Sequence, residues 1–322
     1  MSNDAVKVEL AGFAGRIRGW QEERRFSDSQ MLREYPGLGS TKTYTRILAG
    51  DAEELDCDRW VKDYAAVWNL IQLLAESAEE NEEIYADLTT VTDVRKAVSD
   101  AMRETGNNRM VLVQGPSGSG KTTAARFLQG KYGARILFCE ATEIWKENAN
   151  AMLAGVLQAL GVRQPPVAMA AKFDLAVTKL KESRCCLVID EAHHLGPKTL
   201  NLVKSLLNQT PGEFVLLAMG TLWSRLETQA YAEARQLTQN RLSERLRFDG
   251  VEVADIERLL ERRLGMSGEA KALAKSLAQT ARGHGHLAFV RLVCRQARKL
   301  AGKGAVTEEH VARAASLVAG SR

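Results

Sequence analysis

The sequence predicts an α/β fold in which helices cover both faces of a parallel sheet, with a helical region before it and another after it. Short apolar strands alternate with helical segments in the middle of the 322-residue chain, and a glycine-rich loop follows the first strand. The expected divisions are a helix-turn-helix-like domain, an acidic linker, an α/β core and a helical segment that would act as a lid. Their expected bounds are residues 1–75, 76–90, 91–250 and 251–322.

The N-terminal region is expected to form short helices. Residues 8–26 carry apolar side chains at helical spacing. Ser27 and Ser40 are typical N-cap residues of two short helices that a glycine-containing turn separates. A longer helix is expected from about residue 58, and the acidic stretch 76–83 is interpreted as a solvated linker or a helix end. Short helices joined in this way are typical of a helix-turn-helix module.

The middle of the chain repeats a strand–helix order. This order indicates parallel strands joined by crossover helices. The expected strands are 109–114, 134–140, 185–190 and 214–220, and the expected helices are 91–105, a helix from 121, 143–160, 171–182 and 197–208. From about residue 251 only helices are expected.

The loop after the first strand matches a Walker A phosphate-binding motif. It comprises Gly115, Pro116, Ser117, Gly118, Ser119, Gly120, Lys121 and Thr122, followed by Thr123. Its glycines allow backbone N–H groups to turn toward phosphates, its lysine reaches the β- and γ-phosphates, and its threonine hydroxyl can bind Mg²⁺. The motif therefore predicts binding of ATP with Mg²⁺.

A second motif follows the strand at 185–190, where the apolar run ends in Asp190 and Glu191. Asp190 would hold Mg²⁺, and Glu191 would polarise the attacking water as a general base. His193 and His194 complete the string DEAHH, but the chain is too short for two helicase lobes. We interpret the two histidines as structural or surface groups, because adjacent histidines alone do not give the spacing of a metal site.

The composition is ordinary for a globular protein, with a net charge of +4. Residues 51–100 hold 4 basic and 14 acidic side chains, whereas residues 101–250 hold 19 basic and 13 acidic ones. This asymmetry suggests an anionic partner for the basic part. No apolar run is long enough to span a membrane. The five scattered cysteines favour reduced thiols, and so a cytoplasmic protein.

Taken together, these motifs make the chain resemble the AAA+ regulators of DNA transposition. The resemblance implies a bacterial host and a phage or mobile-element origin. The likeness covers nearly the whole chain. Its segments are STKTYTRILAGD, TVTDVRKAVSDAMRE, the Walker A loop, LVIDEAHHLG, LLAMGT, NRLSERL and the C-terminal helices. The resemblance implies an AAA+ core with a helical lid, self-association into a ring or helical filament, binding of double-stranded DNA with little sequence preference, and delivery of that DNA to a transposase. Slow ATP hydrolysis would disassemble the filament.

The resemblance also assigns roles to single residues. Thr221, at the tip of the fourth strand, would contact the γ-phosphate or the water. Arg241 or Arg245 would act in trans on the ATP of a neighbouring subunit, as the planar guanidinium can bridge phosphate oxygens. The lid position where many relatives carry a second sensor arginine is occupied by Ala288, and Arg291, about one turn later, would substitute for it.

Two DNA-binding surfaces are expected. The second short helix of the N-terminal domain would offer Lys42, Tyr44 and Arg46, unless that domain docks on protein instead. The inner face of the assembly would offer Thr142, Trp145, Lys146 and Lys198 to duplex phosphates. An ATP-dependent DNA-sensing adaptor and a replicative helicase loader remain as alternative functions.

Overall fold

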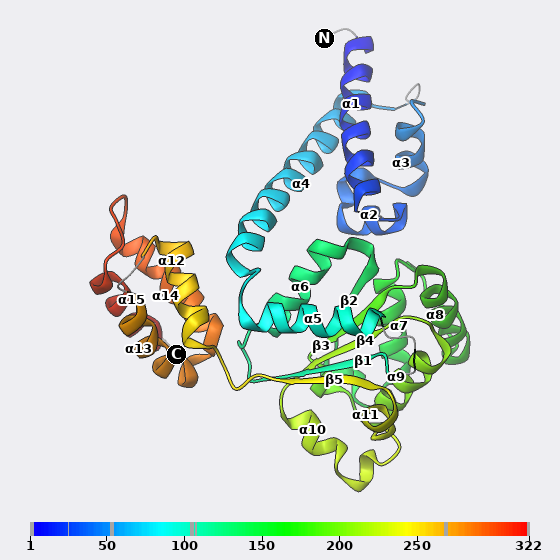
Figure 1. The fold of residues 1–322 in the computed structure, drawn as a ribbon. Helices are drawn as coiled ribbons and strands as arrows, with labels where there is room; N and C mark the ends of the chain where they lie inside the picture. Colours follow the sequence, from blue (N-terminus) through cyan, green and yellow to red (C-terminus); the bar gives the residue numbers. More distant parts are fainter. Residues whose placement is uncertain are drawn as a thin grey trace.

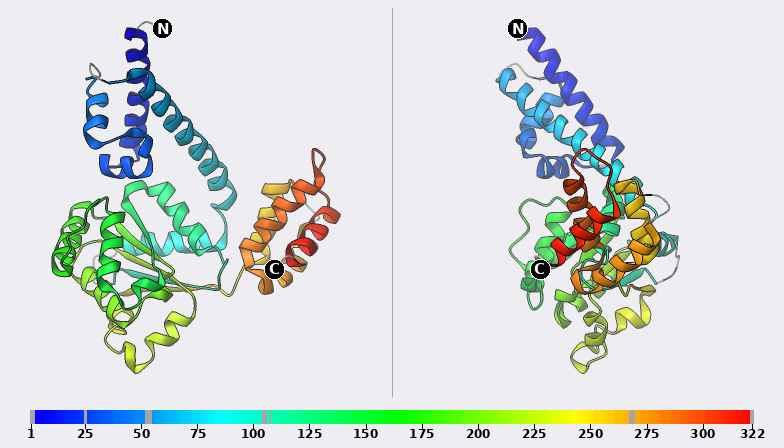
Figure 2. Two further views of the ribbon diagram at one scale, coloured as in Figure 1. Left: turned by 180° about the vertical axis from the view of Figure 1, so that it is seen from behind. Right: turned by 90° about the vertical axis from the view of Figure 1, so that its left-hand side faces the viewer.

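The computed structural model describes residues 3–24, 26–51, 55–103, 106, 108–266 and 270–320, without the side chains of 3, 4, 73–84 and 270. It has an α/β core between an N-terminal helical domain and a C-terminal helical lid (Figure 1). Two further views place the N-terminal domain and the lid on different sides of the core (Figure 2). No helix in the described part of the chain is long and apolar enough to cross a membrane. The five cysteines, all described, are buried.

The N-terminal domain packs around its own apolar cluster. Ile17, Met31, Tyr44 and Tyr64 are among its members, and each is fully buried or nearly so. The side chain of Ser27 caps the second helix in a capping box, and the side chain of Ser40 caps the third. The helices are α1 (Asn3–Glu23), α2 (Asp28–Glu34), α3 (Thr41–Leu48) and α4 (Cys57–Tyr85).

The turn between α2 and α3 depends on glycine. Gly39 has a φ of 86°, and a Cβ atom there would lie 2.6 Å from the ring of Trp60. A larger residue would therefore meet both backbone strain and a clash. α2, this turn and α3 follow one another as the sequence predicted for a helix-turn-helix-like unit.

The long helix α4 leads from the N-terminal domain to the core (Figure 1). The acidic stretch 76–83 lies within this helix, so its backbone is helical. The side chains of this stretch are outside the described residues. Hydrogen bonds also join the N-terminal domain to the core. The Arg33 guanidinium donates to the carbonyl oxygens of Gln158 and Ala159, and Arg24 Nη1 donates to Gly130 O at 3.3 Å.

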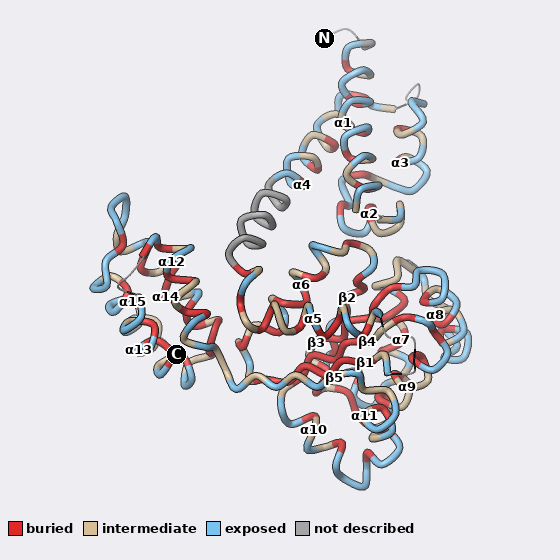
Figure 3. Tube along the Cα trace, in the orientation of Figure 1, coloured by how far each residue is buried: buried red, intermediate tan, exposed pale blue. Residues whose placement is uncertain are grey.

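The core contains a five-stranded parallel sheet with the order β2-β3-β4-β1-β5. The strands are β1 (Met110–Gln114), β2 (Ile136–Glu140), β3 (Cys186–Asp190), β4 (Phe214–Ala218) and β5 (Leu242–Arg247). Every residue of β1, β3 and β4 is buried, as expected for central parallel strands (Figure 3).

Helices cover both faces of the sheet. One apolar cluster joins the first face to α5 (Thr89–Arg103), α6 (Lys121–Tyr132) and the lid. A second cluster joins the other face to the remaining helices of the core. These are α7 (Ala149–Ala159), α8 (Met169–Ser183), α9 (Pro197–Gln209), α10 (Thr221–Leu226) and α11 (Gln236–Asn240). α7 is shorter than the helix expected at 143–160, because residues 143–145 form a separate 3-10 turn.

The strand β5 was not among the strands expected from the sequence, where this segment was considered only for its candidate trans-acting arginines, Arg241 and Arg245. β5 pairs with β1 at the edge of the sheet, and its residues alternate between half-buried and exposed. Half of its side chains thus face solvent, which explains why charged residues interrupt its apolar pattern.

The lid is formed by four helices and docks on the junction between α4 and α5. The buried carboxylate of Asp255 accepts hydrogen bonds from Thr89 N at 2.9 Å and Thr89 Oγ1 at 3.0 Å. A lid residue thus caps the N-terminus of a core helix. The lid helices are α12 (Val253–Leu264), α13 (Ala270–His284), α14 (His286–Ala301) and α15 (Glu308–Gly320).

Candidate functional site

The phosphate loop joins the end of β1 to the start of α6, as its motif requires. Gly118 and Gly120 have φ values of 78° and 99°. A Cβ atom on Gly118 would lie 2.1 Å from Gly285 O of the lid, so this loop position has room for no side chain. The loop turns its backbone toward a helix N-terminus, the arrangement that binds phosphate groups.

Lys121 is buried and lies against its own loop. Its Nζ donates to Gly115 O at 2.9 Å and to Pro116 O at 2.8 Å. Burial lowers the pKa of Lys121, and the carboxylates of Glu191 and Asp190 oppose that shift. The ammonium group is therefore held by weak neutral acceptors, which phosphate oxygens could replace with stronger, charge-assisted bonds.

The groups expected to hold magnesium are adjacent. Thr122 Oγ1 donates to Asp190 Oδ2 at 2.7 Å, and Asp190 Oδ1 accepts from Glu191 N at 2.8 Å. A hydroxyl and a carboxylate side by side at the phosphate loop are oxygen ligands that suit Mg²⁺. These residues therefore fit the ion that the motifs imply.

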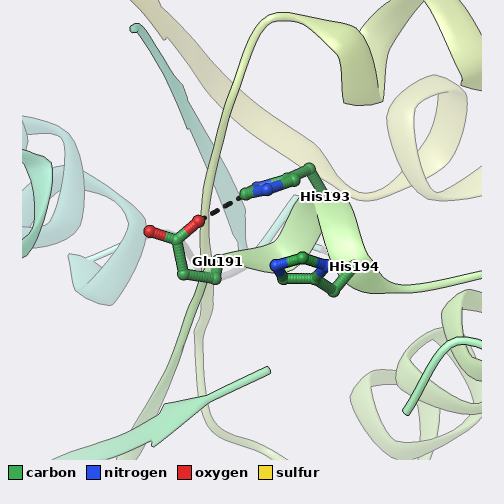
Figure 4. Close-up of side chains that lie close together, drawn as sticks. All are labelled: Glu191, His193 and His194. Atoms are coloured by element: carbon green, nitrogen blue, oxygen red, sulfur yellow. Dashed lines mark ion pairs between the residues drawn. The ribbon is translucent and has the colours of Figure 1, made fainter. Parts of the chain in front are cut away.

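Glu191 follows β3 in a left-handed backbone conformation, with a φ of 53°. Its carboxylate is 43% exposed, and Oε2 lies 3.2 Å from Nδ1 of the buried His193 (Figure 4). Burial lowers the pKa of His193, and Glu191 opposes the shift. His194 stacks on His193 and its Nδ1 lies 2.8 Å from Oε2 of Glu143.

The phosphate loop and the lid together line a cavity of about 200 Å³. Its lining combines loop residues, Glu191 and the α14 residues Leu287, Ala288 and Arg291. Ala288 N also donates to Gly118 O at 3.2 Å, so the lid touches the loop directly. The structure thus brings Arg291 to the site, as the sequence analysis expected. The contacts of Gly285 and Ala288 with the loop were missed, because backbone and methyl groups leave no chemical signal in a sequence.

Residues of the motif differ in their distance from this cavity. Ser117, Gly118, Gly120, Lys121, Thr122 and Thr123 line it. Ser119 is buried beneath the loop, where its Oγ lies 3.4 Å from Lys121 Nζ. Thr221 is exposed at the start of α10 and is not among the described residues that line the cavity.

The two candidate finger arginines lie at different heights along β1: Arg241 is at its amino end, and Arg245 pairs with Leu112 in its middle. Met110 N, at the start of β1, donates to Arg241 O, and Arg241 Nε donates to Asn208 Oδ1 at 2.7 Å. The phosphate loop begins at the other end of this five-residue strand, roughly 15 Å away at about 3.3 Å per residue. Arg241 is therefore remote from the ATP site of its own subunit.

Arg245 lies beside its own phosphate loop. Its Nε donates to Oε1 of Gln114, the last residue of β1, at 2.7 Å. Its guanidinium also lies 3.6 Å from the ring centroid of Trp223 on α10. Arg245 is thus bonded to the residue that precedes its own phosphate loop, whereas Arg241 is remote from that loop, so Arg241 remains the candidate for a trans-acting residue.

The expected DNA contacts are only partly exposed. Thr142, Lys146 and Lys198 are exposed, and the backbone of Gly196 lies against Lys146 O, so their loops touch. Trp145 is 7% exposed and packs against Gly155. The prediction of a DNA contact from Trp145 is therefore wrong.

In the N-terminal domain, Lys42 on α3 is exposed. Arg46 forms two hydrogen bonds with Asp51, at 2.9 and 3.2 Å. Tyr44 is fully buried, and its hydroxyl donates to Gln21 Oε1 at 2.6 Å. Tyr44 therefore stabilises the domain and is not available to DNA.

A phosphate loop and an acidic pair at the carboxyl edge of a parallel sheet define a P-loop nucleotide-binding core. Comparison with known families identifies it more closely: residues 103–226 match the family described as AAA domain. Residues 103–226 are therefore similar to an AAA domain, and the chain has an α/β core of the AAA+ fold between a helical N-terminal region and a helical lid.

Solved structures support this fold. Among 464 matching chains is the crystal structure of Cdc6p from Pyrobaculum aerophilum, with a TM-score of 0.52 and 17% sequence identity. The similarity covers 71% of this chain and 66% of that one, so it spans just under two thirds of that chain's length. No curated protein matches this chain in sequence.

Proposed function

We propose that this protein is an ATP-dependent DNA-binding regulator of transposition. It would assemble on duplex target DNA, deliver that DNA to a transposase and come apart when ATP is hydrolysed. The observation that carries the proposal is the separation of Arg241 from the phosphate loop of its own subunit. A site that holds Lys121, Glu191 and Arg291 but lacks Arg241 is complete only when a neighbouring subunit supplies the arginine.

ATP binding would begin at the phosphate loop. Lys121 Nζ would exchange the carbonyl oxygens of Gly115 and Pro116 for the β- and γ-phosphates. Thr122 and Asp190 would hold Mg²⁺, which neutralises charge on the phosphates. Arg291 would reach the phosphates from the lid, so that nucleotide binding fixes the lid on the core.

Hydrolysis would depend on Glu191 and on the neighbour. The Glu191 carboxylate, partly exposed to the cavity, would accept a proton from the attacking water. Arg241 of the adjacent subunit would stabilise the charge that develops on the transferred phosphoryl group. Thr221, at the edge of the sheet, would approach the γ-phosphate only after α10 shifts toward the loop.

DNA would bind where the loops after β2 and β3 meet. Thr142, Lys146 and Lys198 are exposed on this one surface. Lys146 and Lys198 each lie close to a glutamate, at 3.3 Å from Glu143 and 3.7 Å from Glu147. Duplex phosphates would compete with these exposed pairs, which are weak in water. Such binding would be insensitive to sequence and sensitive to salt. Lys42 on α3 would add a second contact.

Electron microscopy with random-sequence duplex DNA tests the proposal. The chain would be imaged with a slowly hydrolysed ATP analogue and with ADP. We expect rings or helical coats on DNA with the analogue and bare DNA with ADP. Bare DNA in both conditions would refute target capture and favour the adaptor. A stable complex with a replicative helicase, without coating of DNA, would favour the helicase loader.

A further inference from the structure

The fold brings three metal-binding side chains together beside the nucleotide site. Glu191, His193 and His194 each offer one ligand atom, and these atoms lie within 4.8 Å of one another (Figure 4). The residues are close in sequence, but the left-handed conformation of Glu191 turns its carboxylate back toward the two rings. Adjacent histidines alone give no metal-site spacing, whereas this turn supplies the third ligand.

His193 provides independent support for a ligand. The residue is 7% exposed, and its buried Nδ1 atom has no hydrogen-bond partner among the described residues. This nitrogen lies 3.2 Å from Glu191 Oε2. Ligand atoms on a tetrahedral zinc ion are about 3.4 Å apart, because each is about 2.1 Å from the metal. Two of the three ligand atoms therefore already have the spacing of a zinc site, and the third must move by at most about 1.4 Å, the difference between 4.8 Å and that spacing.

Glu143 supplies a carboxylate that can orient the ring of His194 for binding a metal. Its Oε2 lies 2.8 Å from His194 Nδ1, and it comes from the 3-10 turn after β2, far from the histidines in sequence. Histidines that bind metals are commonly oriented by a carboxylate on the other ring nitrogen. Glu143 is thus placed to fix the ring of His194.

We propose that Glu191, His193 and His194 form a binding site for a divalent transition metal of the zinc class, and that an ion there inhibits ATP hydrolysis. Imidazole nitrogens favour such ions over Mg²⁺, which prefers oxygen ligands. A metal bound to Glu191 occupies the carboxylate that would accept the proton of the attacking water. This inhibitory role rests on the proposed ATPase function, whereas binding of the metal does not.

The first test measures binding without nucleotide. Zinc chloride is titrated into the full chain, previously freed of metals, by calorimetry, and cobalt(II) is used as a visible-absorption probe. We expect one ion per chain. The variants His194→Ala and Glu143→Gln should each weaken zinc affinity by about tenfold or more. His310→Ala, which removes a histidine from the lid, should leave the affinity unchanged. No uptake, or uptake that His194→Ala does not weaken, would overturn the site.

The second test measures hydrolysis at saturating Mg-ATP with increasing zinc. Zinc should inhibit the unaltered chain, and His194→Ala should require at least about ten times more zinc for the same inhibition. Equal inhibition of both proteins would show that zinc acts elsewhere and would overturn the regulatory role. If the chain hydrolyses no ATP at all, the proposed function fails, while the binding titration still decides the metal site.

Discussion

The two ends of the central strand β1 differ in how complete they are. At the carboxyl end, Lys121, Thr122 and Asp190 already contact one another or the loop that will hold the phosphates. At the amino end, Arg241 is half-buried and bonded through its side chain to Asn208 and to the carbonyl oxygen of Asn240. The carboxyl end therefore holds a preorganised set of groups for ATP and Mg²⁺, whereas the amino end holds Arg241, a cation that this set lacks.

In the proposed assembly, the two ends of β1 would serve the ATP sites of two different subunits. Groups that bind nucleotide gain from being fixed before it arrives, because the cost of ordering them is met during folding. A group that must act only after assembly gains from being remote from its own site. ATP hydrolysis would then be fast only when a neighbouring subunit is bound. The predictions below test this arrangement, beginning with the largest expected effect.

Replacing Arg241 should have the largest effect on hydrolysis. We expect Arg241→Ala to lower kcat by about 10³-fold or more, the range found when an arginine supplied in trans is lost. ATP affinity of the isolated chain should stay unchanged, because Arg241 is remote from its own phosphate loop. Steady-state ATPase assays and nucleotide titrations measure the two quantities. Arg247→Ala, which removes an exposed arginine from β5, the strand that follows Arg241, is the control.

Replacing Glu191, which lies at the carboxyl edge of the sheet, should lower the rate of hydrolysis nearly as much as replacing Arg241 at the amino end of β1. Glu191→Gln should lower kcat by about 10²–10⁴-fold, the usual contribution of a general base, while ATP still binds. Mixing this variant with Arg241→Ala gives the sharpest test of the comparison. A mixed interface in which the first variant supplies Arg241 and the second supplies Glu191 should regain activity. If equimolar mixtures stay inactive while both variants assemble, the two ends do not cooperate across subunits.

Much of the nucleotide site could be predicted from the sequence, because its residues are local in the chain. The phosphate loop depends on glycines at fixed positions, and the observed φ values of Gly118 and Gly120 agree with that requirement. The capping serines, Ser27 and Ser40, were likewise predicted from neighbours within one turn. The three central strands β1, β3 and β4 were predicted because continuous burial gives continuous apolar runs.

Features that depend on distant residues could not be predicted. Trp145 was expected to contact DNA because it matches the DNA-facing region after the second strand in the family that the chain resembles, but Gly155 leaves space for its ring to be buried. Arg245 was an alternative to Arg241 in sequence, but β5 pairs it with Leu112 of β1, from where its side chain bonds to Gln114 of the same subunit. β5 itself is a half-exposed edge strand, and its charged residues resembled a solvated helix face.

The lid arginine should have an intermediate effect. Arg291→Ala should weaken ATP binding by about tenfold to a hundredfold, equal to roughly 1.5–3 kcal/mol for a hydrogen bond to a charged group. The reason is that Arg291 lines the cavity over the phosphate loop, where Ala288 offers only a methyl group. Fluorescent-nucleotide titration measures the change. Arg295→Ala, one turn further along α14 and exposed, should bind ATP normally; equal losses in both variants would indicate a general effect on the lid.

The smallest effect per residue is expected on the surface where the loops after β2 and β3 meet. Lys146→Ala and Lys198→Ala should each reduce the slope of log affinity for duplex DNA against log salt by about 0.9, because each lysine would release one counterion. Lys179→Ala, on the exposed side of α8, is the control. Affinity is measured by fluorescence anisotropy with the ATP analogue present at several salt concentrations. An unchanged slope in the double variant would show that DNA does not touch this surface, and α3 with Lys42 would then be the place to look. A slope reduced by about two would place the DNA at the same carboxyl edge as the nucleotide, so that one edge of the sheet senses both ligands.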